Sequence, residues 1–386
     1  MDFDDTPEDA AFRAELRAWL AANHPGPLPG DADDAFEFRR AWQRRLADAG
    51  WVAPGWPRAW GGREASVAQR VIYQEELAEA RAPTVINSIG VWNIGPAILE
   101  YGTDEQLQRW LPPMLAADEI WCQGFSEPSA GSDLAALATR AERDGDAYVI
   151  TGQKVWISRA NRSDRCLLLC RSDPSEQRHR GMSMIVVDMR APGVEVRPLR
   201  EITGGTEFNE VFFTEVRAPV VDRLGDEGDG WRVAMATLTH ERVGTVTYGI
   251  NLRQRLEQLL AHEESWPSDP VRAAALQQEL ADLYVRVQII RLTALRAVTK
   301  AARGDDPWPE VPIGKLHWSL VSQDLAEAAM HAFGPDGLRW KGDADAIDDG
   351  SWAHDEVWSR MTTIGAGTTE IQKNILAERA LGLPRG

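Results

Sequence analysis

The sequence is poor in cysteine and in positive charge, and each shortage excludes a class of protein. Three cysteines among 386 residues show no metal-type spacing, which suggests a reducing compartment and structural thiols. Lys and Arg number 42 against 59 Asp and Glu, a formal net charge of −17. We therefore expect neither nucleic acid nor an anionic membrane surface as a partner.

Long hydrophobic runs are also missing. Nowhere does the sequence have about 18 consecutive apolar residues, the length of a membrane span. The opening segment MDFDDTPEDA has neither a basic stretch nor an apolar core, so we expect no signal peptide. No G-x-G-x-x-G follows a strand-like segment, which argues against a Rossmann site. These absences predict a cytoplasmic protein without a membrane span.

The chain does contain two changes of hydrophobic period. Helical spacing marks the first third, where Thr6 is a candidate N-cap, and Thr103 with Gln106 matches a capping box. Strand-like segments with turn signals between them follow from about Cys122 to Gly228. These segments cover residues 147–158, 165–172, 182–189, 193–199 and 209–216.

Helical spacing returns after Gly230. One long stripe repeats every three to four residues and fits a bundle helix; its members are Leu276, Leu280, Leu283, Val287 and Ile290. We therefore predict an α+β multidomain fold. Residues 1–120 form an N-terminal helical domain, residues 121–229 an antiparallel β-barrel or sandwich, and residues 230–386 a C-terminal four-helix bundle.

The segment FSEPSAGSD, residues 125–133, is the most specific motif in the chain. From physical chemistry alone, its Gly-Ala-Ser loop can offer backbone N–H groups to a pyrophosphate, and an ordinary turn explains it equally well. The motif resembles the first signature of the acyl-CoA dehydrogenase flavoprotein family, and the tail EIQKNILAERALGLPRG is also similar to that family. The resemblance implies FAD as cofactor, with Phe125, Ser126 and Gly131 at the flavin and Ser132 near the pyrophosphate and the acyl thioester.

Further flavin contacts are implied on a strand and near the C-terminus. By the resemblance, Trp156 packs beside the isoalloxazine and Ser158 hydrogen-bonds near its N5 atom. Thr368 and Glu370 match family positions that touch the flavin. Each has a plainer alternative, since a strand tryptophan is commonly a core residue and a carboxylate in a first helical turn is favoured by the helix dipole. The stretch TIGAGTTEIQKN, residues 363–374, also reads simply as a helix cap.

The family's chemistry requires a carboxylate base, and one expected position lacks it. Short- and medium-chain members carry a glutamate where this chain has Ala366. Members resembling the isovaleryl-CoA and long-chain enzymes keep it before an arginine in an early C-terminal helix, which matches Glu241 and Arg242. Glu241 also falls on an apolar stripe with Trp231, Met235, Leu238, Thr245, Tyr248 and Leu252. A buried ion pair is the alternative for Glu241, and Arg242 is a candidate substrate-binding residue.

The resemblance thus implies FAD-dependent α,β-dehydrogenation of an acyl-CoA, with room at Ala366 for a branched or bulky acyl group. An electron-transfer flavoprotein is the implied acceptor, and a homodimer, a homotetramer or a heterotetramer with a paralogous subunit is the implied assembly. Two departures bear on this: LAHEESWPSDPVR lacks the family's Arg-x-x-Phe-Gly, and HAFGPDGLRW lacks its glutamine. The alternatives are a non-catalytic or half-catalytic partner subunit, a dehydrogenase of carrier-protein thioesters, and a nitroalkane oxidase, for which the expected aspartate base is missing.

Overall fold

The computed structural model describes residues 5–176, 178–243, 245–306 and 308–384, and the chain divides into two compact units. We call residues 1–18, 67–80 and 243–386 the bundle unit, and residues 19–66 and 81–242 the sheet unit. This grouping differs from the three predicted domains, 1–120, 121–229 and 230–386, whose boundaries stay a prediction. The helical, β-rich and helical regions of the predicted α+β fold are all present.

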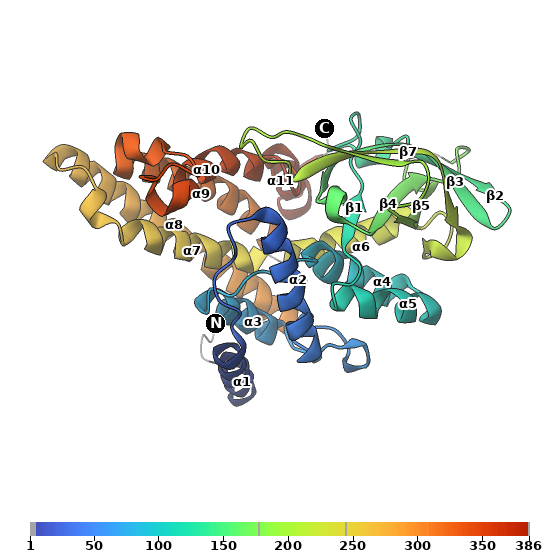
Figure 1. Cartoon of the computed structure of the whole chain (residues 1–386), viewed down its shortest axis with the longest axis horizontal. Coiled ribbons are helices and arrows are strands. Elements are labelled where there is room, and N and C mark those ends of the chain that lie inside the picture. Colours follow the sequence, from blue (N-terminus) through green and yellow to red (C-terminus); the bar gives the residue numbers. More distant parts are fainter. Residues whose placement is uncertain (1–4, 177, 244, 307, 385–386) are drawn as a thin grey trace. The chain divides into compact units, whose positions relative to one another are not determined.

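Helices build the bundle unit, and α7, α8 and α9 pack on one another (Figure 1). The Asp9 N–H donates to the Thr6 hydroxyl at 3.2 Å, so Thr6 caps α1 as predicted. The helices of this unit are α3 (Val67–Glu79), α7 (Thr245–Leu260), α8 (Pro270–Ala302), α9 (Glu310–Phe333), α10 (Ser351–Trp358), α11 (Thr369–Ile375) and the start of α1 (Pro7–Asn23).

The core of the bundle unit confirms the predicted stripe of α8. All five of its residues, from Leu276 to Ile290, are buried. They pack with apolar residues of α7 and α9 and with Trp352 of α10. Burial of such a stripe, rather than helix propensity, supplies most of the stability of a bundle helix.

The sheet unit contains one mixed β-sheet. Its strand order is β6-β7-β3-β2-β4-β5-β8, and β1 pairs with β4. Its helices are α2 (Ala32–Asp48), α4 (Gly95–Tyr101), α5 (Asp104–Leu115), capped by the predicted Thr103–Gln106 box, and α6 (Gly230–Val243), which ends at the unit boundary. Its strands are β1 (Trp121–Gly124), β2 (Arg140–Asp144), β3 (Ala147–Ser158), β4 (Arg165–Arg171), β5 (Met182–Asp188), β6 (Val194–Pro198), β7 (Phe208–Pro219) and β8 (Arg223–Leu224).

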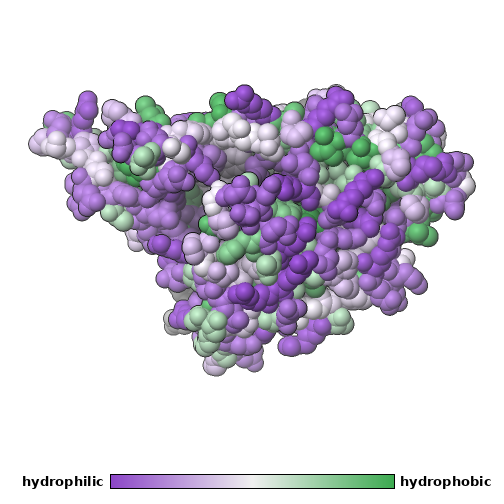
Figure 2. Space-filling model, viewed as in Figure 1, coloured by the Kyte–Doolittle hydropathy of each residue, from purple (hydrophilic) through white to green (hydrophobic). Residues whose placement is uncertain are grey.

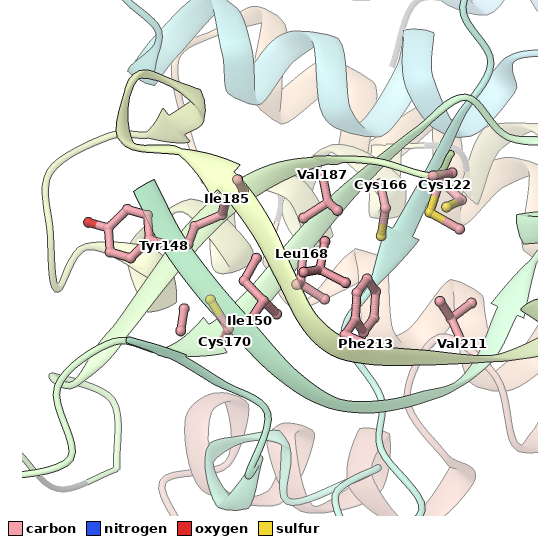
Figure 3. Close-up of a cluster of buried hydrophobic side chains, with 14 of the residues drawn as sticks. Cys122, Tyr148, Ile150, Cys166, Leu168, Cys170, Ile185, Val187, Val211 and Phe213 are labelled. Atoms are coloured by element: carbon pink, nitrogen blue, oxygen red, sulfur yellow. The ribbon is translucent and has the colours of Figure 1, made fainter. Parts of the chain in front are cut away.

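The pairing is mainly antiparallel, as predicted, but β1 runs parallel to β4. That register sets Cys122 opposite Cys166, and both thiols are buried with Cys170 among apolar side chains such as Ile150 and Phe213 (Figure 3). Burial raises the pKa of Cys170 to about 12. A thiol that stays protonated in an apolar core is unreactive, which fits the predicted structural role.

Hydrophilic side chains cover most of the face drawn in Figure 2, and hydrophobic residues appear there only in small patches. Within the described ranges, none of the helices is long and apolar enough to cross a membrane. The same residues contain no cluster of His, Cys, Asp and Glu suited to a metal ion.

Candidate cofactor site

Residues 125–133, which we call the signature loop, leave the sheet directly after β1. Phe125 is buried and Ser126 is half-buried, and the Ser126 carbonyl accepts a hydrogen bond of 2.9 Å from the Val155 N–H of β3. Glu127 and Ala130 exchange two backbone hydrogen bonds, which close a tight turn. The loop is therefore an ordered extension of the sheet rather than a loose connection.

The carboxylate of Glu127 and the ammonium of Lys154 fasten this loop from inside. Lys154 Nζ lies 2.8 Å from Glu127 Oε1 and donates to the Phe125 carbonyl at 2.9 Å. Glu127 also accepts the N–H groups of Ala138 and Thr139, at 2.7 and 2.9 Å. Burial alone raises the pKa of Glu127, but Lys154 and these hydrogen bonds hold that pKa below its ordinary value.

Trp156 is placed by a bulge in β3. Strict alternation puts Tyr148, Ile150, Lys154 and Trp156 on one face, and the first three are fully buried. The β3–β7 register shifts between Lys154 and Ile157, and Trp156 takes a left-handed φ of 60°. Trp156 is therefore 62% exposed, whereas Ile157 takes the inward position. The alternative that Trp156 is a core aromatic is wrong.

The other predicted residues of the sheet unit lie around these two features. Gly131 and Ser132 are exposed at the end of the signature loop, and the space beside the Gly131 α-carbon is open to at least 4 Å. Ser158 is half-buried at the end of β3, two residues beyond Trp156, and pairs with Phe208 of β7. The sheet unit thus presents an exposed indole face and a glycine loop that approaching atoms can reach.

Thr368 and Glu370 lie in the bundle unit, in the segment that opens α11. The Thr368 hydroxyl accepts the Ile371 N–H at 3.2 Å, so the predicted helix cap is confirmed. We call residues 363–368 the C-terminal turn. Within it, Ala366 has a left-handed φ of 54°, and its carbonyl accepts a 3.0 Å hydrogen bond from the amide of Gln372. Glu370 is exposed in the first turn of α11.

A buried lysine of α9 holds the segment that precedes this turn. Lys315 Nζ donates to the Thr362 carbonyl at 2.8 Å. The Ser319 hydroxyl, which has one proton to donate, lies 2.8 Å from the same oxygen and 2.8 Å from the Lys315 carbonyl. Burial lowers the pKa of Lys315, and the charge of Glu370 opposes that shift. The C-terminal turn therefore starts from a fixed point on α9.

The predicted base Glu241 and its neighbour Arg242 have side chains that lie outside the described part of the chain. The earlier residues of α6 correct one expectation. Trp231, Met235 and Leu238, predicted as the apolar stripe, are only half-buried. Among the side chains of α6 that the structure describes, the fully buried ones are Val233, Ala234 and Thr237, each 0% exposed.

Glu127 and Lys154 were missed as site residues by the sequence argument. A signal for Lys154 exists, because a lysine on the inward face of an alternating strand requires a buried anionic partner. Its partner is 27 residues away in sequence. That separation hides the pair until the fold brings loop and strand together.

Comparison with known proteins agrees with this architecture. Family models of the acyl-CoA dehydrogenase N-terminal, middle and C-terminal domains match residues 6–118, 122–216 and 228–381. The chain is 42% identical over 392 residues to the acyl-CoA dehydrogenase IpdE1 of Mycobacterium tuberculosis, with 97% of each chain covered. The chain belongs to the acyl-CoA dehydrogenase family.

Two solved structures are also similar over the whole chain. The ChsE4-ChsE5 complex from Mycobacterium tuberculosis gives a TM-score of 0.88 at 29% identity, covering 100% of both chains. The Tcur3481-Tcur3483 steroid ACAD gives a TM-score of 0.86 at 27% identity, again covering 100% of both.

Family membership makes this chain an FAD-dependent oxidoreductase that acts on acyl-CoA. The described residues fit the cofactor. The flat indole of the exposed Trp156, held on a bulge of β3, suits contact with a planar ring system. The open space at Gly131 admits a bulky group close to the backbone.

Proposed function

We propose that this chain carries out α,β-dehydrogenation of an acyl-CoA thioester with Glu241 as the base that removes the α-proton. Bound FAD supplies the acceptor for the β-hydrogen and its two electrons. Phe125, Ser126, Trp156 and Ser158 hold and orient that cofactor from the sheet unit. Ser132 contacts its pyrophosphate side and the thioester, and Gly131 leaves space for the approach.

We assign the remaining contacts to three further residues. Thr368 and Glu370 contact the cofactor from the start of α11. Arg242 contacts the substrate. The acceptor that reoxidises the cofactor is a further flavoprotein of the electron-transfer type.

The observation that carries the assignment of Glu241 is the buried face of α6. Position 241 follows Thr237 by four residues and Ala234 by seven, so the helical repeat sets it in register with the fully buried residues Val233, Ala234 and Thr237. A glutamate at this position supplies the carboxylate that a general base for proton abstraction requires.

The C-terminal turn supports the same assignment by what it contains. Residues 363–368 read TIGAGT and include no proton acceptor of the carboxylate type. Gly365, Ala366 and Gly367 are all small, which suits a bulky acyl group. Because the similar protein Tcur3481-Tcur3483 is a steroid ACAD, we extend the proposal to a ring-bearing acyl chain.

The test is anaerobic bleaching of the flavin by a panel of straight, branched and steroid-type acyl-CoAs. Glu241→Gln should give a folded, FAD-loaded protein whose flavin is no longer reduced, with the rate lowered by a factor of about 10³ or more. Glu257→Gln, on the exposed face of α7, is the matched control and should reduce normally. Near-normal reduction by Glu241→Gln sinks the assignment of the base.

A second candidate is a subunit that works only with a paralogous partner. Exposed apolar side chains form a stripe on α8 at helical spacing, Val285, Ile289 and Leu292, beside Tyr284. Such a stripe favours a protein partner, and both similar structures, Tcur3481-Tcur3483 and ChsE4-ChsE5, are named for two chains. The test is the FAD content of the purified chain. If the chain alone contains well below one FAD per chain, and co-expression with a paralogue restores about one, this candidate replaces the self-sufficient enzyme.

A further inference from the structure

An ion pair closed off from solvent lies directly beneath the signature loop. The side chains of Lys154 and Glu127 are 0% and 4% exposed. Lys154 lies on β3, two residues before Trp156 and the bulge. The pair therefore connects the glycine loop to the strand that carries the exposed indole.

Three hydrogen bonds join this pair to both ends of one segment, and a fourth joins Lys154 to Glu127. Lys154 Nζ bonds Glu127 and the Phe125 carbonyl at the start of the loop. Glu127 in turn accepts the N–H groups of Ala138 and Thr139, beyond the far end of the loop. Loss of Lys154 therefore frees the start of the loop, and loss of Glu127 frees its far end.

Net stability is a poor account of such a pair. Removing two charges from water costs about as much as their attraction returns, so a neutral pair of similar volume can be equally stable. What a neutral pair cannot reproduce is the directed set of four bonds. Geometry is therefore the property that depends on the charges.

We propose that Glu127 and Lys154 are positioning residues for FAD: they fix the spacing between the signature loop and the bulge at Trp156. Phe125 and Ser126 on one side and Trp156 on the other then meet the cofactor without rearrangement. A preformed surface binds more tightly because no loop has to be ordered on binding. This inference rests on the cofactor-binding roles proposed above for those three residues.

The experiment compares FAD release and apoprotein stability in three variants of the full chain. Glu127→Asp keeps the charge but withdraws it by one methylene. The double variant Glu127→Gln with Lys154→Met removes both charges at similar volume. Arg109→Met with Asp222→Asn is the control, because it neutralises another ion pair of the sheet unit, between α5 and the segment before β8.

FAD release is followed by flavin fluorescence after dilution, and stability by the melting temperature of the apoprotein. We expect both Glu127 variants to release FAD about tenfold faster, equivalent to about 1.4 kcal/mol of binding. We expect the control pair to release FAD at the wild-type rate even where its melting temperature falls.

Wild-type release by Glu127→Asp, or a control that releases FAD as fast as the double variant, overturns the proposal, because the pair then serves only folding. If the double variant does not fold, Glu127→Asp against the control still decides. A failure of the proposed dehydrogenation is a distinguishable outcome, because FAD release is measured without substrate and does not depend on whether the flavin is reduced.

Discussion

Two buried lysines hold two segments of this chain, and they do so with different partners. Lys154 of the sheet unit bonds a carboxylate and a carbonyl, and thereby fixes the signature loop. Lys315 of the bundle unit bonds the Thr362 carbonyl and fixes the segment before the C-terminal turn. Burial lowers the pKa of both lysines.

The difference lies in what each lysine would leave behind. Without Lys154, the Glu127 carboxylate stays buried with no cation to balance it. Without the Lys315 side chain, the Thr362 carbonyl still has the Ser319 hydroxyl within 2.8 Å as a donor, which it shares with the carbonyl of residue 315. The group that each lysine bonds, rather than the buried charge itself, therefore determines how much stability is lost with that lysine.

The largest expected effect comes from making the same substitution at both sites. Lys154→Met should lower the free energy of unfolding by about 3–5 kcal/mol, the usual cost of an unpaired buried charge. Lys315→Met should cost only about 1–2 kcal/mol, because one hydrogen bond is lost and no group is orphaned. Urea unfolding of the two apoproteins, followed by tryptophan fluorescence, measures the difference.

Equal losses of stability at the two sites would contradict the claim that the bonded partner determines the cost. They would mean that Glu127 is protonated or solvated once Lys154 is gone. Glu127→Gln in the Lys154→Met background tests the buried carboxylate directly. This second substitution should recover most of the lost stability if the unpaired carboxylate causes the loss.

Sequence periodicity predicted the strand that carries Lys154 and the helix α8 that packs on α9, the helix of Lys315. It did not predict the surroundings of either lysine. Alternation of apolar residues in 147–158 predicted β3, and the heptad-like stripe from Leu276 to Ile290 predicted α8. The bulge at Trp156 was not predictable, because it arises from pairing with β7, whose register no local pattern contains. Four-residue β1 was missed for a related reason, since only its parallel pairing with β4 makes it a strand.

The candidate site divides along the same line. The motif at 125–133 and Thr368 were visible in the sequence because turn chemistry and capping are local. The face of α6 was predicted wrongly, because Trp231 is large and apolar yet only half-buried, whereas the small Val233 and Ala234 are fully buried. Hydrophobicity alone cannot tell which face of a helix a neighbouring element covers.

Acid should reduce the stability lost by Lys154→Met more than that lost by Lys315→Met. The folded protein holds the pKa of Glu127 below its ordinary value, so the unfolded chain takes up this proton first as the pH falls. The contribution of the pair is therefore complete above the ordinary glutamate pKa, about 4.3, and is lost as the pH falls through the lower folded pKa. We expect the stability gap between wild type and Lys154→Met to shrink over that range.

The gap for Lys315→Met should change less over the same range, because the Thr362 carbonyl does not titrate and Glu370, whose charge acts on Lys315, is exposed to solvent. Melting temperatures from about pH 7 to about pH 3 test both statements. A Lys154→Met gap that stays constant in acid would show that charge on Glu127 is not what the substitution strands.

The smallest expected effect lies in the C-terminal turn itself. Ala366 has a φ of 54°, a left-handed conformation that costs a residue with a Cβ about 1–2 kcal/mol. Ala366→Gly removes this strain but gives the unfolded chain more freedom, so a net gain of up to about 1 kcal/mol is expected. Ala274→Gly on the exposed side of α8 is the control, and it should lose about 1 kcal/mol. If Ala366→Gly destabilises as much as the control does, the turn is held by its hydrogen bond to Gln372 without strain, and both anchored segments are then relaxed.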